Sequence, residues 1–211
     1  MTEGAAHDIS ATPRPETALV AALGERSVVL IGMMGAGKSS IGRRVGLRLG
    51  IPFVDADTEI EKAAGMNIPD IFAAHGEGDF RAGEARVIAR LLESHPQVLA
   101  TGGGAVMHEG TRALISAKGF SVWLKADYDV LMRRIRRRHD RPLLKTDDPG
   151  ATLRNLMDLR YPVYSLADLT VQSRDVPHDK IVDEIVVALA GRLGCEPPHN
   201  TSESGEGEHT P

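Results

Sequence analysis

Residues 28–40 read VVLIGMMGAGKSS, a short aliphatic run followed by glycines, a lysine and two serines. The run at 28–31 has the composition of a strand that is buried on both faces, as in a parallel sheet covered by helices. Residues 32–39 match G-x-x-x-x-G-K-S, the pattern of a phosphate-binding P-loop. Because the loop leads directly into the amphipathic stretch IGRRVGLRLG, the sequence predicts a strand–loop–helix unit that binds nucleotide phosphates.

The residues of this loop suit different parts of that task. Its glycines let backbone amides turn inward around a phosphate chain, and the following helix presents its positive N-terminal end to the phosphate. Lys38 can reach the outer phosphates of a nucleoside triphosphate, and the hydroxyl of Ser39 can ligate magnesium. An ordinary glycine-rich turn with a surface lysine is the weaker interpretation, because the match is long and lies between a strand and a helix. The loop does not identify the acceptor of the phosphate.

The composition argues against several kinds of function. A formal net charge of -4 does not suit a protein that coats nucleic acid, and an aromatic content of 4% does not suit a stacking platform for single strands. The sole cysteine, Cys195, excludes an intrachain disulfide and fits a reducing compartment. No apolar segment approaches the length of a membrane span, and residues 1–16 lack the order of a signal peptide. We therefore expect a cytoplasmic enzyme.

The chain is expected to form one domain between two tails. Its 211 residues can bury a substantial core, whereas 1–25 and 195–211 are polar enough to predict disordered tails around a domain at 26–194. Five apolar runs alternate with helical patterns in that domain: SVVLIG at 27–32, PFVDAD at 52–57, QVLATGGG at 97–104, FSVWLK at 120–125 and DLTVQ at 168–172. This order predicts an α/β fold, a three-layer sandwich around a five-stranded parallel sheet, of the P-loop NTPase and nucleoside-monophosphate-kinase-like class. Ligands of such sheets bind beyond the carboxyl ends of the strands.

Two carboxylates end the second apolar run. If the strand continues through both Asp55 and Asp57, their side chains point to the same side, because side chains alternate along a strand. One could then hold the water shell of magnesium, and the other could accept a proton from an attacking hydroxyl. The alternative is that one of them caps the following helix, and Asp57 could do so while still contacting a substrate.

The third apolar run ends in Gly102, Gly103 and Gly104. Many P-loop NTPases place a magnesium-binding aspartate at this point, so its absence shifts the metal-associated role toward Asp55. Three glycines in a row exceed what an ordinary turn needs, which favours close approach of the backbone to a bound molecule. No N-K-x-D motif occurs, which weakens the interpretation of the chain as a GTPase.

Several arginines in other parts of the chain are also candidate site residues. Arg81 and Glu84 are three residues apart, a spacing that fits a surface ion pair or a guanidinium positioned for a carboxylate or phosphate. Arg160 ends a helical pattern just before a break that contains a proline. The segment MRRIRRRHDRPLLK is strongly basic, and three interpretations of it are open: a patch that binds nucleic acid, a solvated face of a helix, or a mobile lid at about 133–148. Arg141 belongs to that run, and Pro142 favours an extended conformation for it. The histidines show no metal-ligand spacing.

Taken together, GMMGAGKSS, FVDAD, DFRAGE, ATGGG, RPLL and LRYPVYSLA resemble shikimate kinases in order and spacing over about residues 27–193. The P-loop alone would indicate only an NTPase, but the remaining motifs are far more discriminating. The resemblance implies transfer of the γ-phosphate of ATP to the 3-hydroxyl of shikimate, on the route to chorismate and aromatic amino acids. It also implies one Mg²⁺ ion, no membrane or nucleic-acid partner, and a monomer.

The resemblance assigns residues to ATP and to the metal. Residues implied to bind ATP are Gly35, Ala36, Gly37, Lys38, Ser39 and Ser40 in the loop, Arg141 in the lid, and Arg134 and Pro177 beside the adenine ring. The metal is assigned to Ser39 directly and to Asp55 through water. Lys38 and Arg141 count as catalytic because they would contact the phosphates.

The resemblance also assigns the second substrate to a segment at about 57–93 and to the glycine run. Asp57 would bind the hydroxyls of shikimate and is the candidate base. Arg81, Gly103 and Arg160 would hold the substrate, the arginines through its carboxylate. Glu84 would orient that pocket, with Gly102 and Gly104 lining it.

Two other functions remain open at this level. Another small-metabolite kinase with the same architecture, such as a gluconate kinase, would share the P-loop. A nucleotide-dependent regulator touching nucleic acid through residues 133–138 would explain the basic run but not Asp57, Arg81 and Arg160 together.

Overall fold

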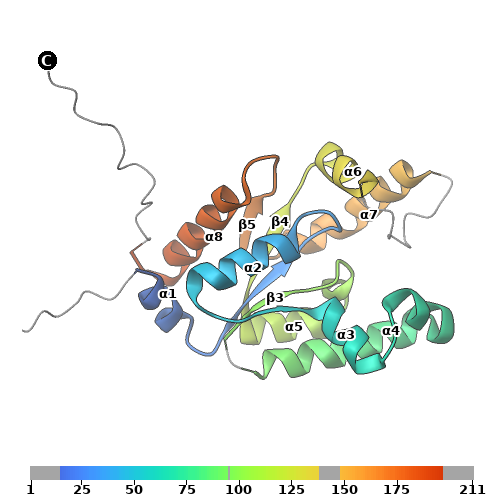
Figure 1. The fold of residues 1–211 in the computed structure, drawn as a ribbon, viewed down its shortest axis with the longest axis horizontal. Helices are drawn as coiled ribbons and strands as arrows, with labels where there is room; N and C mark the ends of the chain where they lie inside the picture. The colour runs from blue at the N-terminus through green and yellow to red at the C-terminus, as the bar shows by residue number, and fades with distance from the viewer. Residues whose placement is uncertain (1–14, 95, 138–147, 197–211) are drawn as a thin grey trace, which may run out of the picture.

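The computed structural model describes residues 15–94, 96–137 and 148–196. Their centre is a five-stranded sheet in which every neighbouring pair of strands is parallel, in the order β2-β3-β1-β4-β5 (Figure 1). The strands are β1 (Ser27–Ile31), β2 (Phe53–Asp55), β3 (Val98–Ala100), β4 (Gly119–Lys125) and β5 (Leu169–Gln172). The predicted parallel sheet is therefore confirmed, and each strand lies inside the apolar run that indicated it except β4, which begins one residue earlier, at Gly119.

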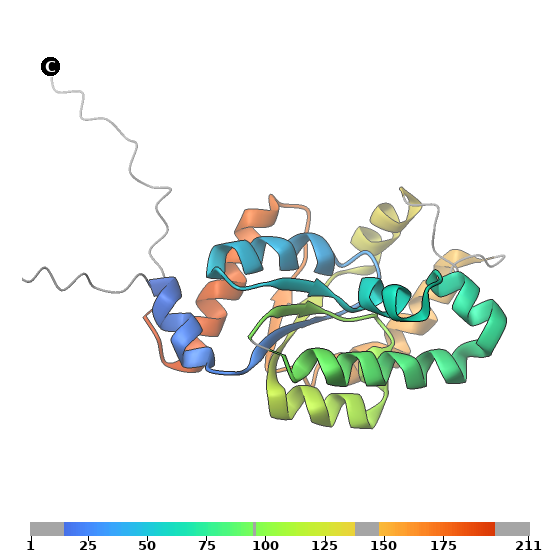
Figure 2. The ribbon, with the colours of Figure 1, turned by 60° about the horizontal axis from the view of Figure 1, so that its bottom comes forward.

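Helices cover both faces of this sheet, which confirms the three-layer prediction. They are α1 (Pro15–Leu23), α2 (Lys38–Leu49), α3 (Ala56–Ala64), α4 (Ile68–Leu92), α5 (Glu109–Lys118), α6 (Tyr128–Arg136), α7 (Pro149–Tyr164) and α8 (His178–Leu193), with a 3₁₀ turn at Ala105–Met107. Figure 2 shows α2 and α8 on one face and α4 and α5 on the other. In Figure 1, α3, α4, α6 and α7 gather at the end toward which the β1 arrow points.

Burial in the core explains why the aliphatic run at 27–31 forms β1, the central strand of the sheet. All five residues of β1 are buried, and Leu30 lies in register with Ala100 of β3 and Val122 of β4. A strand with neighbours on both sides and helices above and below has no polar face, so a continuous aliphatic run is what it requires. The register also brings the ends of β1, β3 and β4 to one edge, where the loops after them meet.

The N-terminal boundary of the domain differs from the prediction. Residues 1–25 were expected to be a disordered tail, but Pro15–Leu23 form helix α1, and its Leu19 and Leu23 are buried in the main core. Glu16 also forms an ion pair with Arg48 of α2 at 2.8 Å. The reason is the apolar run ALVAAL at 18–23, whose two leucines lie one turn apart on the buried side of a helix; the prediction grouped this run with the polar, proline-containing residues before it.

Leu19→Ala tests whether α1 belongs to the cooperative core. Leu19 is completely buried, and removing such a side chain costs about 2–5 kcal/mol of unfolding free energy. Denaturant unfolding of the purified protein measures the change. Thr17→Ala, on the exposed side of the same helix, is the matched control and should change stability by less than about 0.5 kcal/mol. Equal, small effects of both substitutions would show that α1 is not part of the folded unit.

Helix α7 also departs from the prediction. It was expected to break after Arg160, but it continues through Pro162 to Tyr164. Proline removes only the bond from its missing N–H to the carbonyl of Asp158, and both of these residues are exposed to water. Because the ring lies close to the end of the helix, Tyr164 still completes the last turn.

The segment at 57–93, predicted to bind substrate, corresponds to α3 and α4. These helices share a small hydrophobic cluster of Ile60, Ile71 and Phe80, separate from the main core. Helix α4 bends at Gly76, whose φ of 77° lies in the left-handed region. The two helices therefore form a compact unit at the edge of the sheet where the loops meet.

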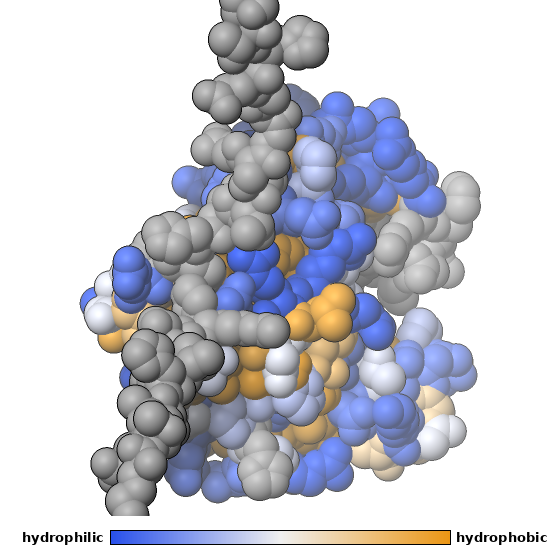
Figure 3. All heavy atoms as spheres, turned by 60° about the vertical axis from the view of Figure 1, so that its left-hand side comes forward, coloured by the Kyte–Doolittle hydropathy of each residue, from blue (hydrophilic) through white to orange (hydrophobic). Residues whose placement is uncertain are grey.

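The outer surface agrees with a core closed by these layers. Around the grey segments, the face that carries α1 and α8 is mainly hydrophilic, with separate hydrophobic areas (Figure 3). The most exposed large hydrophobic residue in the described chain is Leu47, at 84% exposure. Within the described ranges, no helix is long and apolar enough to cross a membrane.

Candidate active site

The P-loop forms the turn between β1 and α2. Gly35 and Gly37 have φ angles of 81° and 94°, in the left-handed region where a β-carbon is unfavourable. Gly37 is also the residue that precedes the first turn of α2, and it has no side chain with which to cap that helix. A helix start without a side-chain cap suits an anionic ligand, which is the use that the motif predicts.

Lys38 is held over this loop by the backbone. Its ammonium group donates to the carbonyl of Gly32 at 2.8 Å and to that of Met33 at 3.1 Å. The side chain thus curls back from the start of α2 across the turn. This geometry places a positive charge beside the amides that would surround phosphate.

Ser39 and Asp55 come together at the same edge, from α2 and the end of β2. The hydroxyl of Ser39 donates to Oδ2 of Asp55 at 2.6 Å, and the other oxygen of Asp55 accepts from the amide of Asp57 at 3.1 Å. Asp55 is therefore the N-cap of α3. The predicted capping role is confirmed for one of the two carboxylates, although it falls on Asp55 and not on Asp57.

The same contact corrects the expected strand. β2 ends at Asp55, and Asp57 lies in the first turn of α3, so the two side chains do not alternate along one strand. The capping bond from Asp55 starts the helix there and turns the backbone away from the sheet. Asp57 still reaches the site, but from a helix.

A hydroxyl and a carboxylate are hard oxygen ligands of the kind that Mg²⁺ prefers. The pair formed by Ser39 and Asp55 therefore fits the predicted metal. Across the described residues, no group of three or more His, Cys, Asp or Glu side chains is placed to hold a metal ion. A site with few protein ligands is typical of Mg²⁺ that keeps most of its water and binds nucleotide phosphates.

Gly102 marks the point where two carboxylates converge. A β-carbon on Gly102 would lie 2.5 Å from Oε1 of Glu84 and 3.0 Å from Oδ1 of Asp57. These side chains come from α4 and α3, and they meet over the loop that follows β3. Only a glycine allows so close an approach.

The next two glycines bring in the arginines. A β-carbon on Gly103 would lie 3.2 Å from Nη1 of Arg160, and one on Gly104 would lie 2.6 Å from Nη2 of Arg81. The same position at Gly103 is 3.4 Å from the carbonyl of Gly32, at the start of the P-loop. The residues predicted to bind the second substrate are therefore gathered around residues 102–104, next to the phosphate loop.

The ion pair of Arg81 is part of this pocket. Its Nη1 lies 2.8 Å from Oε2 of Glu84, and its Nη2 lies 3.1 Å from Glu77. Glu84 is only 2% exposed, so burial raises the pKa of its carboxyl, while the bond from Arg81 opposes that rise. The other oxygen of Glu84 has no hydrogen-bond partner within the described residues, although it is buried. An unsatisfied buried acceptor is costly, and a ligand hydroxyl would satisfy it.

Arg134 connects the P-loop to the residue that follows the edge strand β5. Its guanidinium donates to the carbonyl of Gly35 at 3.3 Å and to Oγ of Ser173 at 2.9 Å. The hydroxyl of Ser173 in turn donates to the carbonyl of Ala36 at 2.8 Å. Pro177 precedes the first turn of α8 in the same region. The predicted contacts of Arg134 and Pro177 with adenine remain predictions.

Part of the basic run lies outside the described residues. Arg141 and most of the predicted lid at 133–148 fall there. Arg133 and Arg134, which are described, both form ion pairs with Asp175. Their charge is partly engaged within the fold.

Two residues near the site were missed by the sequence reasoning. Tyr164 donates from its hydroxyl to the carbonyl of Gly103, and Ser173 bonds to the P-loop as described above. Tyr164 follows Arg160 by four residues, a spacing that places both on one face of a helix and could have indicated it. Ser173 carries no comparable signal, because it reaches the P-loop only through the pairing of distant strands.

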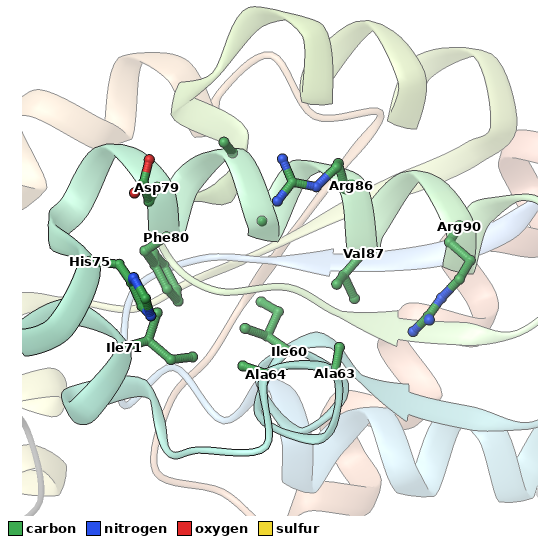
Figure 4. Close-up of a pocket in the computed structure, with 12 residues that line it drawn as sticks. Ile60, Ala63, Ala64, Ile71, His75, Asp79, Phe80, Arg86, Val87 and Arg90 are labelled. Atoms are coloured by element: carbon green, nitrogen blue, oxygen red, sulfur yellow. The ribbon is translucent and has the colours of Figure 1, made fainter.

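A separate hollow lies between α3 and α4 (Figure 4). It has a volume of about 530 Å³, and Ile60, Ala63 and Ala64 of α3 face Phe80 and Val87 of α4 across it. The hollow lies within the segment at 57–93 that was predicted to bind substrate, but none of the individual residues predicted to bind ATP or shikimate lines it. The hollow is therefore distinct from the pocket at residues 102–104.

A loop for nucleotide phosphates has no need of an adjoining pocket of arginines and carboxylates unless a second molecule receives the phosphate. The fold and this pocket together define a P-loop kinase. The model of the shikimate kinase family matches residues 34–190, well over half of the chain. The chain belongs to the shikimate kinase family, and it is an ATP-dependent phosphotransferase.

Individual relatives agree with this family. The shikimate kinase of Bradyrhizobium diazoefficiens is 62% identical over 194 residues, which cover 90% of this chain and 94% of that protein. That of Rhodopseudomonas palustris is 63% identical over 183 residues, covering 87% and 90%. A solved shikimate kinase from Acinetobacter baumannii, in complex with shikimate, superposes with a TM-score of 0.77 at 33% identity, covering 82% of this chain and 97% of that one. The family resemblance read from the motifs is confirmed, and membership of this family favours neither a gluconate kinase nor a nucleotide-dependent regulator.

Proposed function

We propose that this chain transfers the γ-phosphate of ATP to the 3-hydroxyl of shikimate, on the route to chorismate and aromatic amino acids. The observation that carries the proposal is the convergence of Asp57, Glu84, Arg81 and Arg160 on residues 102–104, beside the P-loop. Two cations and two carboxylates suit a small molecule that is anionic at one end and hydroxylated at the other. The related enzyme from A. baumannii has been solved with shikimate bound, which supports this choice of substrate.

In this proposal the arginines hold the acid end of the substrate. Arg81 and Arg160 would bind the carboxylate of shikimate, since a guanidinium forms paired hydrogen bonds with a carboxylate. The free oxygen of Glu84 would accept a bond from a hydroxyl of the ring. The ring hydroxyls would then lie beside Asp57, and the glycine backbone at 102–104 would contact the ring directly.

The nucleotide would lie along the P-loop, with residues 35–40 around its phosphates. Lys38 would balance the charge of the outer phosphates, and Ser39 with Asp55 would hold Mg²⁺ and its water. Bound Mg²⁺ supplies neutralisation of phosphate charge. Phosphoryl transfer needs little covalent help from protein, so positioning and charge would provide most of the rate. Arg141 would add charge from the lid, a role that stays a prediction.

Asp57 would face the attacking hydroxyl. It would accept the proton of that hydroxyl during transfer, or orient the hydroxyl by a hydrogen bond. Its place in the first turn of α3, whose start is fixed by Asp55, gives its carboxylate a defined position. We also infer a monomeric cytoplasmic enzyme whose partners are its two small substrates, in keeping with one free cysteine and an acidic net charge.

A coupled assay of ADP formation tests the substrate. The purified protein, with ATP and Mg²⁺, is given shikimate, gluconate or quinate in separate reactions. ADP is expected to form only with shikimate, and mass spectrometry with NMR should place the new phosphate on the 3-hydroxyl. Turnover that is independent of shikimate, or faster with gluconate, would overturn the proposal.

Gly102→Ala is expected to weaken shikimate binding without affecting ATP. The added β-carbon would lie 2.5 Å from Oε1 of Glu84, so the carboxylate must move away from its place beside Asp57. Such overpacking costs about 1–3 kcal/mol, which corresponds to a KM for shikimate raised about 5- to 150-fold. Steady-state kinetics with each substrate varied in turn measures the effect.

The matched control for this change is Gly78→Ala. Gly78 lies in α4, the helix that carries Glu84, but it is exposed and an added β-carbon there meets nothing within 4 Å. Both constants of that variant should stay within about twofold of the parent. A similar rise in the KM for shikimate in both variants would show that the effect does not depend on the contact between residue 102 and Glu84.

A further inference from the structure

Tyr164 occupies an unusual place between the two halves of the site. It lies on α7, four residues after Arg160, and it is completely buried. Its hydroxyl donates to the carbonyl of Gly103, in the loop after β3, and lies 3.8 Å from the sulfur of Met33 at the start of the P-loop. One phenol therefore contacts the proposed substrate loop and the beginning of the nucleotide loop.

The side chain of Arg160 is a second partner of this hydroxyl, through a hydrogen bond and through its positive charge. A β-carbon on Gly103 would lie 3.2 Å from Nη1 of Arg160 and 3.5 Å from the hydroxyl oxygen of Tyr164. The single proton of the hydroxyl is used by the carbonyl of Gly103, so its lone pairs remain for the guanidinium, which can only donate. Burial raises the pKa of Tyr164 to about 12, against the opposing charge of Arg160, so the phenol keeps this proton at neutral pH.

The ring alone does not account for a tyrosine here. Tyr164 packs near Trp123 and Tyr161, with ring centroids 5.9 Å and 6.1 Å away. Phenylalanine would fill that space equally well, and a buried hydroxyl must find partners or cost free energy. The partners it has found, Gly103 and Arg160, are both residues to which we assign shikimate contacts.

We propose that Tyr164 is a positioning residue for shikimate, which fixes the guanidinium of Arg160 relative to the backbone of Gly103. It acts through these two groups and does not itself contact the reacting atoms. The inference rests on the proposed function, because it concerns the same pocket. It predicts that loss of the hydroxyl affects shikimate far more than ATP, although the hydroxyl also lies close to Met33.

The test compares Tyr164→Phe with Tyr161→Phe in the full-length protein. Tyr161 is a matched control because it lies on the same helix, packs on Trp123 at 4.9 Å, and donates its own hydroxyl to the carbonyl of Ala126. Steady-state kinetics should show a KM for shikimate raised about tenfold in Tyr164→Phe, as expected for the loss of one hydrogen bond next to a charged group. The kcat and the KM for ATP should stay within about threefold, and Tyr161→Phe should change neither KM.

A double-mutant cycle asks whether Tyr164 works through Arg160. Arg160→Lys keeps the charge but loses the planar fork, so it should raise the KM for shikimate by itself. If the hydroxyl orients that fork, the variant carrying both changes should bind shikimate about as weakly as Arg160→Lys alone. Fully additive effects would mean that Tyr164 and Arg160 act independently, which contradicts the proposal.

Thermal melting with each ligand gives a second readout. Shikimate should stabilise Tyr164→Phe less than it stabilises the parent, whereas the shift produced by ATP should be unchanged. Equal weakening of both ligands, an unchanged KM for shikimate, or failure of the variant to fold would show that the hydroxyl serves the fold only. The activity of the parent protein distinguishes failure of the proposed function from failure of this inference. If the parent lacks shikimate-dependent turnover, the proposed function fails. If the parent is active and Tyr164→Phe is unaffected, only this inference is overturned.

Discussion

Asp57→Asn is expected to lower kcat by about a thousandfold, within the range of 10²–10⁴ that a positioned general base contributes. Asparagine keeps the size of the side chain but loses the negative charge and the ability to accept a proton. Asp57 is the carboxylate that lies over Gly102 beside Glu84, where the hydroxyl of the substrate would lie. Steady-state kinetics should show the loss in kcat, with a KM for ATP changed by less than about threefold, because the P-loop is untouched.

Asp79→Asn is the control for this change. Asp79 is also a carboxylate of the α3–α4 unit, but it lines the hollow between these two helices (Figure 4). It should leave kcat and both KM values unaffected. If Asp57→Asn retains more than about a third of the parent kcat, neither proton transfer nor strict orientation can be assigned to Asp57.

Lys38→Ala is expected to reduce kcat by about 10²–10³, the loss that follows removal of one fixed charge or donor from a developing anion. The reason is that Lys38 is held across the P-loop by the carbonyls of Gly32 and Met33, beside the amides at the start of α2. Binding of ATP should weaken as well, because the phosphates carry the same charge before transfer. Kinetics and calorimetric titration with an ATP analogue measure the two effects separately.

The control for Lys38→Ala is Lys118→Ala. Lys118 forms an exposed ion pair with Glu93 at 2.9 Å, far from the P-loop, so its loss should not change turnover. Thermal melting of both variants shows whether the carbonyls left by Lys38 destabilise the fold. Near-normal turnover in Lys38→Ala would remove the P-loop lysine from the phosphate site.

The sequence predicts those features that depend on a few neighbouring residues. The aliphatic run at 28–31 requires a strand buried on both faces, and the glycines after it require a turn that no other residue type makes easily. Parallel strands then bring their carboxyl ends to one edge, so Asp55, Lys38 and residues 102–104 had to lie near one another. The pairing of Arg81 with Glu84 follows from helical spacing alone.

Other features depend on competition that sequence patterns do not resolve. The capping bond of Asp55 ends β2 and puts Asp57 on a helix, although two alternating residues fit a longer strand equally well. α1 forms because the apolar residues 18–23 pack Leu19 and Leu23 into the main core, a tertiary contact that the polar stretch before them does not predict. α7 passes Pro162 because both Pro162 and Asp158, whose helical hydrogen bond the proline removes, are exposed residues near the end of the helix. The contact of Tyr164 with Gly103 joins residues 61 positions apart, beyond the reach of local spacing.

A crystal structure of the protein with shikimate and a non-hydrolysable ATP analogue is the most direct measurement of the account as a whole. It should show the carboxylate of shikimate between Arg81 and Arg160, a ring hydroxyl against Asp57, and the terminal phosphate of the analogue over Lys38. Shikimate bound in the hollow between α3 and α4, or Asp57 facing away from both ligands, would contradict it.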